Sequence, residues 1–407
     1  MDGRHQREHR VQPAEGSIAK EKSLDFRPSP EQEMLRAAVA KIAASFGHEY
    51  FHSKAVSGEK PDELWSALAG AGYMGVNVPS EHGGGGMGIS ELAIVCEEVS
   101  AAGCPLLLML VSPAICSSLI RHCGTEEQKA QWLPRFAAGE MKMAFAITEP
   151  DAGSNSHRIA TTAARDGDEW VLNGTKYYIS GMDEAEAVIV VTRSGTEPES
   201  GHAALSLFIV DTGAAGLTFT DIPVEICAPE KQFTVFFDDV SVPASRLLGT
   251  EGEGLRQVFL GLNPERIMSA AISNGIGRFA LERASTYARD RRVWGVPIGT
   301  HQGLAHPLAQ AKIAVELARL MSQKAAWAYD AGLDAAEAAN MAKYAAAEAS
   351  LAALDQAIQV HGGNGLATEY GLADLWGLAR LLRIAPVSRE MILNFVSQHS
   401  LSLPKSY

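Results

Sequence analysis

Cysteine pairs, long apolar runs and a surplus of basic residues are all missing from this sequence of 407 residues. Its five cysteines form no CxxC pair and have no histidine near them at metal-ligand spacing, so we expect reduced thiols, no disulfide framework and no metal site. The longest apolar run, residues 105–115, is too short to span a bilayer and is broken by Ser112 and Pro113. The formal net charge of −13 disfavours nucleic acid as a partner, because phosphate binding needs clustered lysine and arginine.

The first residues of the chain, 1–25, are polar and carry charges of both signs. They have no apolar stretch like that of a signal peptide, and they contain acidic residues (Asp2, Glu8, Glu15 and Glu21 among them), in which a transit peptide would be poor. We therefore predict a disordered tail on a cytoplasmic protein that binds neither a membrane nor nucleic acid.

Three parts with different apolar spacing follow this tail. Residues 26–140 show the helical period, with helix starts at Pro30, Pro61, Ser90 and Thr125. Residues 141–245 change to a period of two, with hairpin turns at 166–167 and 173–174, which predicts an antiparallel β-barrel domain. Residues 250–407 return to the helical period in four long stretches, about 264–291, 302–331, 334–361 and 372–400. The sequence thus predicts an α+β multidomain protein: a helical domain, a middle β domain and a C-terminal four-helix bundle.

Four short segments carry groups that could contact a ligand or cofactor. Residues 146–155 run from a strand into a turn rich in N–H and hydroxyl donors, and residues 173–181 bring the aromatic Tyr178 beside the hydroxyl of Ser180. Arg291 opens a Gly/Pro-rich turn and could bind a pyrophosphate, and tandem glycines at 362–363 permit a close backbone approach to a ligand. Taken singly, each segment is also typical of an ordinary strand, turn or helix cap.

Taken together, the order and spacing of these segments resemble the acyl-CoA dehydrogenase family from about Phe26 to the C-terminus. The resemblance implies FAD as cofactor, an acyl-CoA substrate, an electron-transfer flavoprotein as redox partner, and a homo-oligomer, either a dimer or a tetramer. The reaction it implies is the α,β-dehydrogenation of the thioester to the 2-enoyl-CoA in fatty acid metabolism.

The resemblance also assigns residues to the cofactor. Thr148 would bond the flavin ring, Ser154 would also approach the CoA moiety, and Tyr178 and Ser180 take the places of a tryptophan and a threonine usual beside the ring. The residues expected to hold the flavin are Phe145, Ile147, Thr148, Gly153, Ser154, Tyr178 and Ser180. Those expected to reach the ADP half across a subunit interface are Arg291, Trp294, Gln302, Gln359, Gly362 and Gly363.

The catalytic base is expected to be a carboxylate whose pKa lies near the working pH. Many family members carry this glutamate near the C-terminus, where the present sequence has Pro386. A minority place it at the start of the first bundle helix, where this chain has Glu265, so Glu265 is the candidate base, with Asn263 and Arg266 in the substrate pocket. The same residues also fit a plain helix start, with an asparagine cap, Pro264 at the first position and an acid in the first turn. Lesser candidates for the base are Glu149, Glu369 and Glu390.

Several positions depart from the family pattern. Pro386 has no N–H with which to polarise the thioester carbonyl, so either the register is off by one, or a neighbour such as Val387 donates, or polarisation is weaker in this chain. Asn155 stands where an aspartate is usual, and Asp374 and Leu378 stand where a basic and an acidic residue are usual.

Two alternatives remain open from the sequence. The first is a flavin oxidase or monooxygenase on the same fold, which would differ in how fast the reduced enzyme reacts with oxygen. The second is a flavin-binding relative without dehydrogenase activity, acting as a regulatory or nucleic-acid-binding module. The missing C-terminal glutamate favours the second, whereas the acidic charge opposes its nucleic-acid version.

Overall fold

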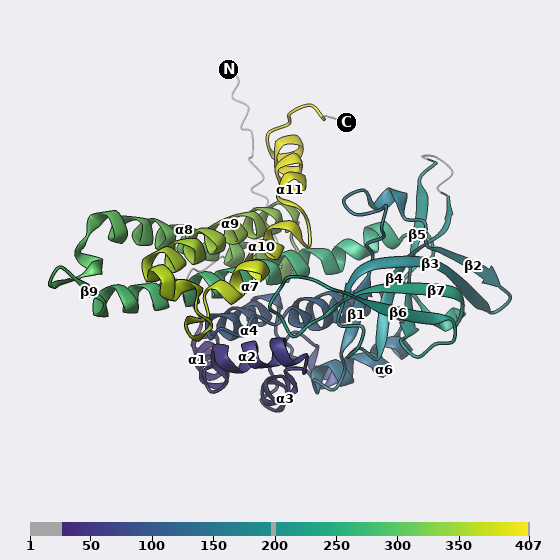
Figure 1. The fold of residues 1–407 in the computed structure, drawn as a ribbon. Helices are drawn as coiled ribbons and strands as arrows, with labels where there is room; N and C mark the ends of the chain where they lie inside the picture. The colour runs from purple at the N-terminus through teal and green to yellow at the C-terminus, as the bar shows by residue number, and fades with distance from the viewer. Residues whose placement is uncertain (1–26, 197–200, 406–407) are drawn as a thin grey trace, which may run out of the picture.

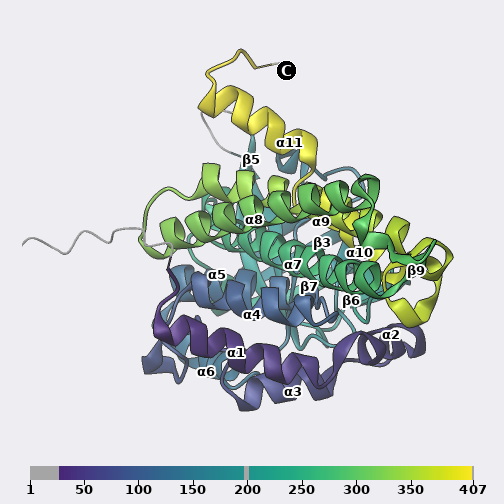
Figure 2. The same ribbon diagram turned by 90° about the vertical axis from the view of Figure 1, so that its left-hand side faces the viewer.

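The computed structural model describes residues 27–196 and 201–405, so the predicted tail, residues 1–25, lies outside the described residues. The chain begins with a helical domain that lies along one side of the bundle (Figures 1 and 2). Its helices are α1 Pro30–Ala44, α2 Gly47–Ser57, α3 Asp62–Gly70, α4 Ile89–Ala101, α5 Ser117–Cys123 and α6 Glu126–Ala137. Short turns η1 Ser80–His82 and η2 Leu110–Cys116 connect them, the second as a π-helix.

The helix starts in this domain agree with the sequence at three positions. Ser29 and Thr125 cap α1 and α6 in capping boxes, and α3 begins at Asp62 directly after Pro61. The predicted cap at Ser90 is wrong by two residues, because Gly88 is the N-cap and α4 begins at Ile89. The carboxylate of Asp330, from a distant helix, accepts hydrogen bonds from the N–H groups of Ile89 and Ser90 at 2.8 and 2.9 Å.

The middle domain is an eight-stranded sheet in the order β6-β7-β3-β2-β4-β5-β8, with β1 paired to β4. The strands are β1 Met143–Ala146, β2 Thr162–Asp166, β3 Glu169–Ser180, β4 Ala187–Thr196, β5 Ala203–Asp211, β6 Leu217–Ile222, β7 Gln232–Pro243 and β8 Leu247–Leu248. Two of the pairings, β1 with β4 and β2 with β4, are parallel. The predicted purely antiparallel domain is therefore corrected to a mixed sheet.

One predicted hairpin turn is a bulge. The turn after Asp166 joins β2 to β3 as expected. Asn173 and Gly174, in contrast, lie inside β3, where the register with β7 shifts between Leu172 and Gly174. A glycine is required there because a Cβ on Gly174 would come within 2.6 Å of the Thr161 backbone.

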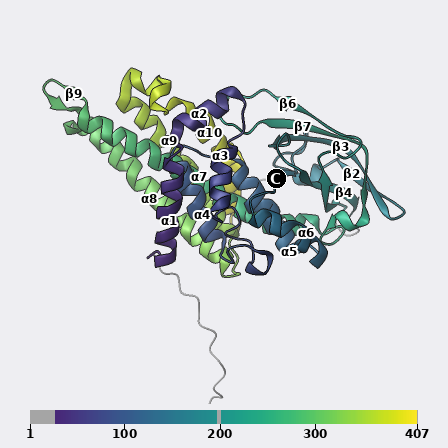
Figure 3. The same ribbon diagram turned by 90° about the horizontal axis from the view of Figure 1, so that it is seen from below.

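The C-terminal domain is built on three long helices, α7 Gly254–Asp290, α8 Gln302–Asp330 and α9 Ala336–His361. A small hairpin, β9 Arg292–Val293 with β10 Val296–Pro297, joins α7 to α8 at the end of the bundle farthest from the sheet (Figures 1 and 3). The fourth predicted helix is broken into α10 Trp376–Ile384 and α11 Arg389–Phe395, because Pro386 cannot continue a helix. α11 projects from the bundle (Figures 1 and 2) but contacts α9, and its Ile392 is buried.

Two cores hold the domains together. Alternate residues of β4 serve both: Ile189 and Val191 face the helices, whereas Val188 and Val190 face the interior of the sheet around Trp170. In the described part of the chain, none of the helices is long and apolar enough to cross a membrane.

Candidate functional site

The predicted flavin strand ends beside the second half of β3. The carbonyl oxygen of Thr148 accepts a hydrogen bond from the Tyr177 N–H at 2.9 Å. The carbonyl oxygen of Ile147 accepts one from Lys176 Nζ at 3.0 Å, and Phe145 is buried in β1. The structure therefore brings the Thr148 segment and the Tyr178 segment together, as the sequence predicted.

Tyr178 has an unusual conformation at this junction. Its φ is +57°, at a register shift between Lys176 and Ile179, and its side chain is 53% exposed. Its ring packs edge-on against Tyr177, with ring centroids 4.4 Å apart. A large aromatic side chain held at the surface in a left-handed conformation is typical of a ligand-binding position.

The other predicted flavin residues near Tyr178 differ in hydrogen bonding and exposure. Ser180 Oγ donates to Gln232 Oε1 at 3.0 Å, which fixes its hydroxyl at the end of β3. Gly153 and Ser154 are exposed in the turn that follows the Glu149–Ala152 bridge, at the rim of this surface.

Glu265 lies in the interior of α7. The predicted helix start at Asn263 is wrong, because α7 begins at Gly254 and passes through Pro264. The proline leaves the carbonyl oxygen of Leu260 without its helical partner, and the hydroxyl of Tyr329 donates to that oxygen at 2.9 Å. The interpretation of Glu265 as a residue of the first helical turn is therefore excluded.

The surroundings of Glu265 suit a catalytic base. Burial raises the pKa of Glu265 to about 7, although the positive charges of Arg266 and Lys343 act in the opposite direction. Glu265 in turn contributes to the raised pKa of the Cys116 thiol, and Cys116 Sγ lies 3.5 Å from the carbonyl oxygen of Ala144 in β1. The π-helix that carries Cys116 thus packs between Glu265 and the flavin strand.

Arg266 and Asn263 form a pair beside Glu265. Arg266 is almost completely buried, and its Nη1 donates to Asn263 Oδ1 at 3.0 Å. The guanidinium also lies 5.7 Å from the centre of the Phe259 ring. The structure therefore brings all three residues that the sequence assigned to the base and substrate pocket into one place.

Lys343 of α9 is a residue of this site that sequence reasoning missed. It is 1% exposed, and its Nζ donates to the carbonyl oxygen of Val387 at 2.6 Å. Burial lowers the pKa of Lys343 to about 8, although Glu265 acts to raise it. In the sequence this lysine stands in an Ala-rich helix with no motif around it, so only the packing of α9 against α7 reveals it.

The lesser candidates for the base are disfavoured by their positions. Glu149 is buried, but Lys176 Nζ lies 2.9 Å from its carboxylate, and the backbone N–H groups of Ala160 and Thr161 donate to it at 2.7 and 3.0 Å. These partners stabilise the charged form and lower the pKa of Glu149. Glu369 and Glu390 are exposed to solvent.

The residues predicted to hold the ADP half lie at the other end of the molecule. They are exposed around the β9–β10 hairpin and the end of α9, far from the sheet in Figures 1 and 3. A stack of Tyr287 on His361, with ring centroids 4.2 Å apart, joins the ends of α7 and α9 there. This set comprises Arg291, Trp294, Gln302, Gln359, Gly362 and Gly363. One chain therefore does not bring the two predicted halves of the cofactor site together.

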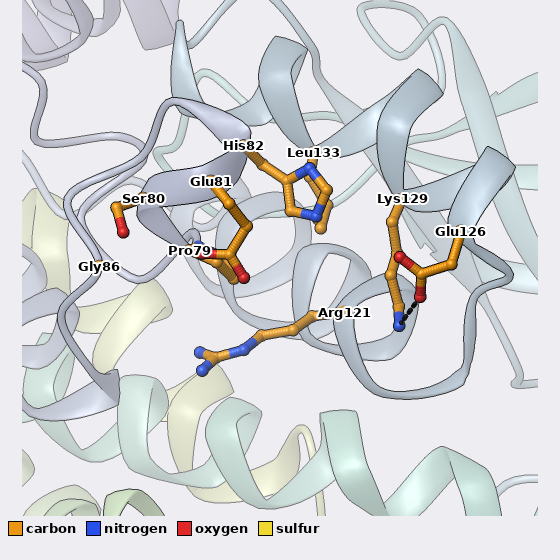
Figure 4. A pocket seen from close by; sticks show the side chains of 9 residues that line it. All are labelled: Pro79, Ser80, Glu81, His82, Gly86, Arg121, Glu126, Lys129 and Leu133. Carbon is orange, nitrogen blue, oxygen red and sulfur yellow. Dashed lines mark hydrogen bonds and ion pairs between the residues drawn. The ribbon is translucent and has the colours of Figure 1, made fainter.

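Two cavities of the described residues lie elsewhere. One, of about 500 Å³, is lined by η1, α5 and α6, with the Arg121 side chain reaching into it and Lys129 paired to Glu126 (Figure 4). The other is an apolar groove of about 810 Å³ between α8, α9 and α11. Neither is lined by a predicted site residue.

Comparison with known proteins agrees with this geometry. The chain matches the acyl-CoA dehydrogenase N-terminal domain over residues 29–140, the middle domain over 144–240 and the C-terminal domain over 252–401. It is 58% identical over 384 residues to the acyl-CoA dehydrogenase FadE12 of Mycobacterium tuberculosis, covering 94% of this chain and 99% of that one.

Solved structures show the same fold. Butyryl-CoA dehydrogenase from Megasphaera elsdenii superposes with a TM-score of 0.87 at 26% identity, covering 93% of this chain and all of that one. A glutaryl-CoA dehydrogenase in complex with glutaryl-CoA gives the same TM-score at 29% identity, with 94% and 98% covered. The predicted fold class, enzyme class and cofactor are confirmed, and the chain belongs to the acyl-CoA dehydrogenase family of FAD-dependent oxidoreductases.

Proposed function

We propose that this acyl-CoA dehydrogenase converts an acyl-CoA to the 2-enoyl-CoA with Glu265 as the base that removes the α proton. The observation that carries the assignment is the position of Glu265 in the interior of α7, beside Arg266 and Lys343. A carboxylate with a pKa of about 7 can accept a proton near neutral pH and is a stronger base than an exposed glutamate. The electrons would then pass to an electron-transfer flavoprotein.

The residues at the junction of β1 and β3 fit the flavin ring. The exposed Tyr178 offers a flat apolar face, and the hydroxyls of Thr148 and Ser180 offer hydrogen-bond partners to the ring edge. Bound FAD supplies the acceptor for the hydride that leaves the β carbon. Phe145, Ile147 and Gly153 would support this surface, and Ser154 at its rim would contact both the cofactor and the CoA moiety.

Polarisation of the thioester carbonyl is assigned to the segment around Pro386. Since Pro386 has no N–H, we assign the donor to the N–H of Val387. The hydrogen bond from Lys343 to the carbonyl oxygen of Val387 supports this role, because it holds the segment in place next to the charges around Glu265.

The two separated sets of cofactor residues are explained by a homo-oligomer. The flavin set of one chain and the ADP set of another would then form one cofactor site across an interface. The exposed ring of Trp294, which is 88% accessible at the tip of the β9–β10 hairpin, supports this arrangement, because a lone chain gains nothing from leaving a tryptophan in water. The apolar groove between α8, α9 and α11 is a second surface suited to another subunit.

The experiment that tests the proposal is an anaerobic titration of the holoenzyme with a panel of acyl-CoAs of different length and branching, followed by flavin absorbance. We expect at least one thioester to bleach the flavin of the wild type. The same thioester should not bleach the flavin of Glu265→Gln. Glu390→Gln, at an exposed glutamate, is the matched control and should behave as the wild type. Bleaching that survives in Glu265→Gln would overturn the assignment of the base.

A second measurement separates the dehydrogenase from an oxidase on the same fold. The reduced enzyme is mixed either with aerated buffer or, without oxygen, with an electron-transfer flavoprotein. Fast reoxidation by the flavoprotein and slow reoxidation by oxygen are expected. The reverse order would assign the chain to the oxidase alternative.

A further inference from the structure

Two histidines, an aspartate and a cysteine meet where the three domains join. His48 and His52 lie four residues apart on one face of α2, so their rings point the same way. Asp374 comes from η8 Ala373–Leu375, just before α10, and Cys227 comes from the segment between β6 and β7. Figures 2 and 3 show α2 beside α10.

One ligand atom each from His48, His52 and Asp374 lies within 4.8 Å of the other two, close enough for the three to hold one metal ion. Asp374 Oδ2 lies 3.1 Å from His48 Nε2 and 3.0 Å from His52 Nδ1. Cys227 Sγ lies 3.7 Å from His52 Nδ1. Around a tetrahedral Zn²⁺ with its usual bond lengths, neighbouring nitrogen, oxygen and sulfur ligands are roughly 3.3 to 3.6 Å apart.

The ligand set is also rigidly held on one side and open on the other. The ring of His48 is buried between Gly103 and Gly371, and a Cβ on Gly371 would come within 2.2 Å of the ring. His52 is 30% exposed, which leaves a path by which an ion could enter.

We propose that His48, His52 and Asp374 form a structural site for a divalent transition metal, which the neighbouring Cys227 thiol joins as fourth ligand, with Zn²⁺ as the ion that these ligands suit best. Two imidazoles and a thiolate favour zinc over magnesium or calcium, which prefer oxygen ligands. When the ion binds, the Cys227 thiol would give its proton to solvent and bind as the thiolate. The sequence analysis predicted no metal site, because these ligands come from three segments far apart in the chain.

The location of the site indicates a structural role, in which one metal ion links the domains. α2 belongs to the helical domain, Cys227 to the middle domain and Asp374 to the bundle, so one ion would tie all three together. Asp374 is also a position where this chain departs from the basic residue usual in the family, and a lysine or arginine there would repel a cation. The site lies apart from Glu265 and takes no part in the proposed dehydrogenation.

The test uses chelator-treated holoenzyme at pH 8, titrated with Zn²⁺ and followed by calorimetry and thermal unfolding, and separately titrated with Co²⁺. We expect one Zn²⁺ per chain, a rise in Tm, and tetrahedral Co²⁺ absorption to the red of the flavin bands. His52→Ala and Cys227→Ser should weaken Zn²⁺ binding by at least about 10- to 100-fold, since even the loss of an outer partner of a ligand has that effect. His52 and Cys227 are partly exposed, so these variants should fold, and retained FAD absorbance confirms that they do.

His306→Ala, at an exposed histidine of α8 outside the cluster, is the matched control and should bind Zn²⁺ as the wild type does. Absence of stoichiometric Zn²⁺ binding would overturn the proposal, and so would equal affinity in His52→Ala and the wild type. A loss of affinity in His306→Ala equal to that in His52→Ala would also overturn it, because the binding would then be unspecific.

Discussion

The side-chain nitrogen of Lys343 lies 2.6 Å from the carbonyl oxygen of Val387, and this hydrogen bond ties α9 to the segment between α10 and α11. Burial raises the pKa of Glu265 to about 7, and the positive charge of Lys343 opposes part of this rise. One lysine thus connects the candidate base with the segment that would polarise the thioester. It acts through these neighbours and is a positioning residue.

Replacing Lys343 by methionine should shift the pH profile of flavin reduction. Without the positive charge, the pKa of Glu265 rises further, so the rate should reach its plateau about one pH unit higher than in the wild type. The rate of anaerobic flavin reduction measured from pH 6 to 9 checks this. Lys324→Met, at an exposed lysine of α8, is the control. A lower rate with an unmoved profile would show that Lys343 only supports the fold.

Replacing Glu265 by glutamine should stabilise the protein at alkaline pH. The folded protein holds the Glu265 proton up to about pH 7, whereas the unfolded chain releases it near pH 4.5, so wild-type stability falls as the pH rises through this range. Glutamine removes this loss, which is on the order of 1–3 kcal/mol. The difference in Tm between variant and wild type should therefore be larger at pH 8 than at pH 5. A difference that does not change with pH would contradict a raised pKa.

The buried ion pair of Lys176 and Glu149 should be costly to break. Lys176 is fully buried, and its Nζ reaches both the Glu149 carboxylate at 2.9 Å and the carbonyl oxygen of Ile147 at 3.0 Å. Lys176→Met would leave Glu149 charged and buried, and we expect a loss of about 3–5 kcal/mol in the free energy of unfolding, measured with urea. FAD should also be retained less well, because the strand end at Thr148 loses its anchor.

The double variant Lys176→Met with Glu149→Gln is the matched control for this pair. Since it removes both charges and keeps a side-chain oxygen as acceptor for the N–H groups of Ala160 and Thr161, it should recover much of the stability lost in the single variant. If the double variant is as unstable as Lys176→Met, the cost arises from packing and not from an unpaired charge.

The sequence predicted elements with strong local signals better than positions set by distant partners. The start of α1 at Pro30 and the capping box of Thr125 with Gln128 each depend on residues within three positions of the helix start, so the sequence could show them directly. Pro264 resembled a helix start, and only Tyr329, 65 positions later, shows why the helix can pass through it. Asn173 and Gly174 resembled a hairpin turn, because the sequence does not show that Thr161 packs close to residue 174. This tertiary contact requires a glycine inside the strand.

In the candidate site too, residues close together in the sequence were predicted better than residues brought together by the fold. Glu265, Asn263 and Arg266 are neighbours in the chain, and the sequence assigned them to one place together. Lys343, and the cluster around Asp374, depend on the packing of helices that are far apart in the sequence, and no local pattern marks them. The sequence marked Asp374 only as a departure from the basic residue usual in the family, not as a metal ligand.

The apolar face of α8 should determine the oligomeric state. Ile313, Leu317 and Leu320 are largely exposed on it, with Leu317 62% accessible, beside the groove that α9 and α11 complete. Since burying such a face is the main gain of association, Leu317→Asp should shift the protein to a smaller species, seen by light scattering after gel filtration. Gln323→Asp, at an exposed polar position of the same helix, should leave the mass unchanged. If the ADP half of FAD is bound across an interface, the smaller species should also lose FAD, whereas a monomer that keeps its full flavin content would contradict a cofactor site shared between chains.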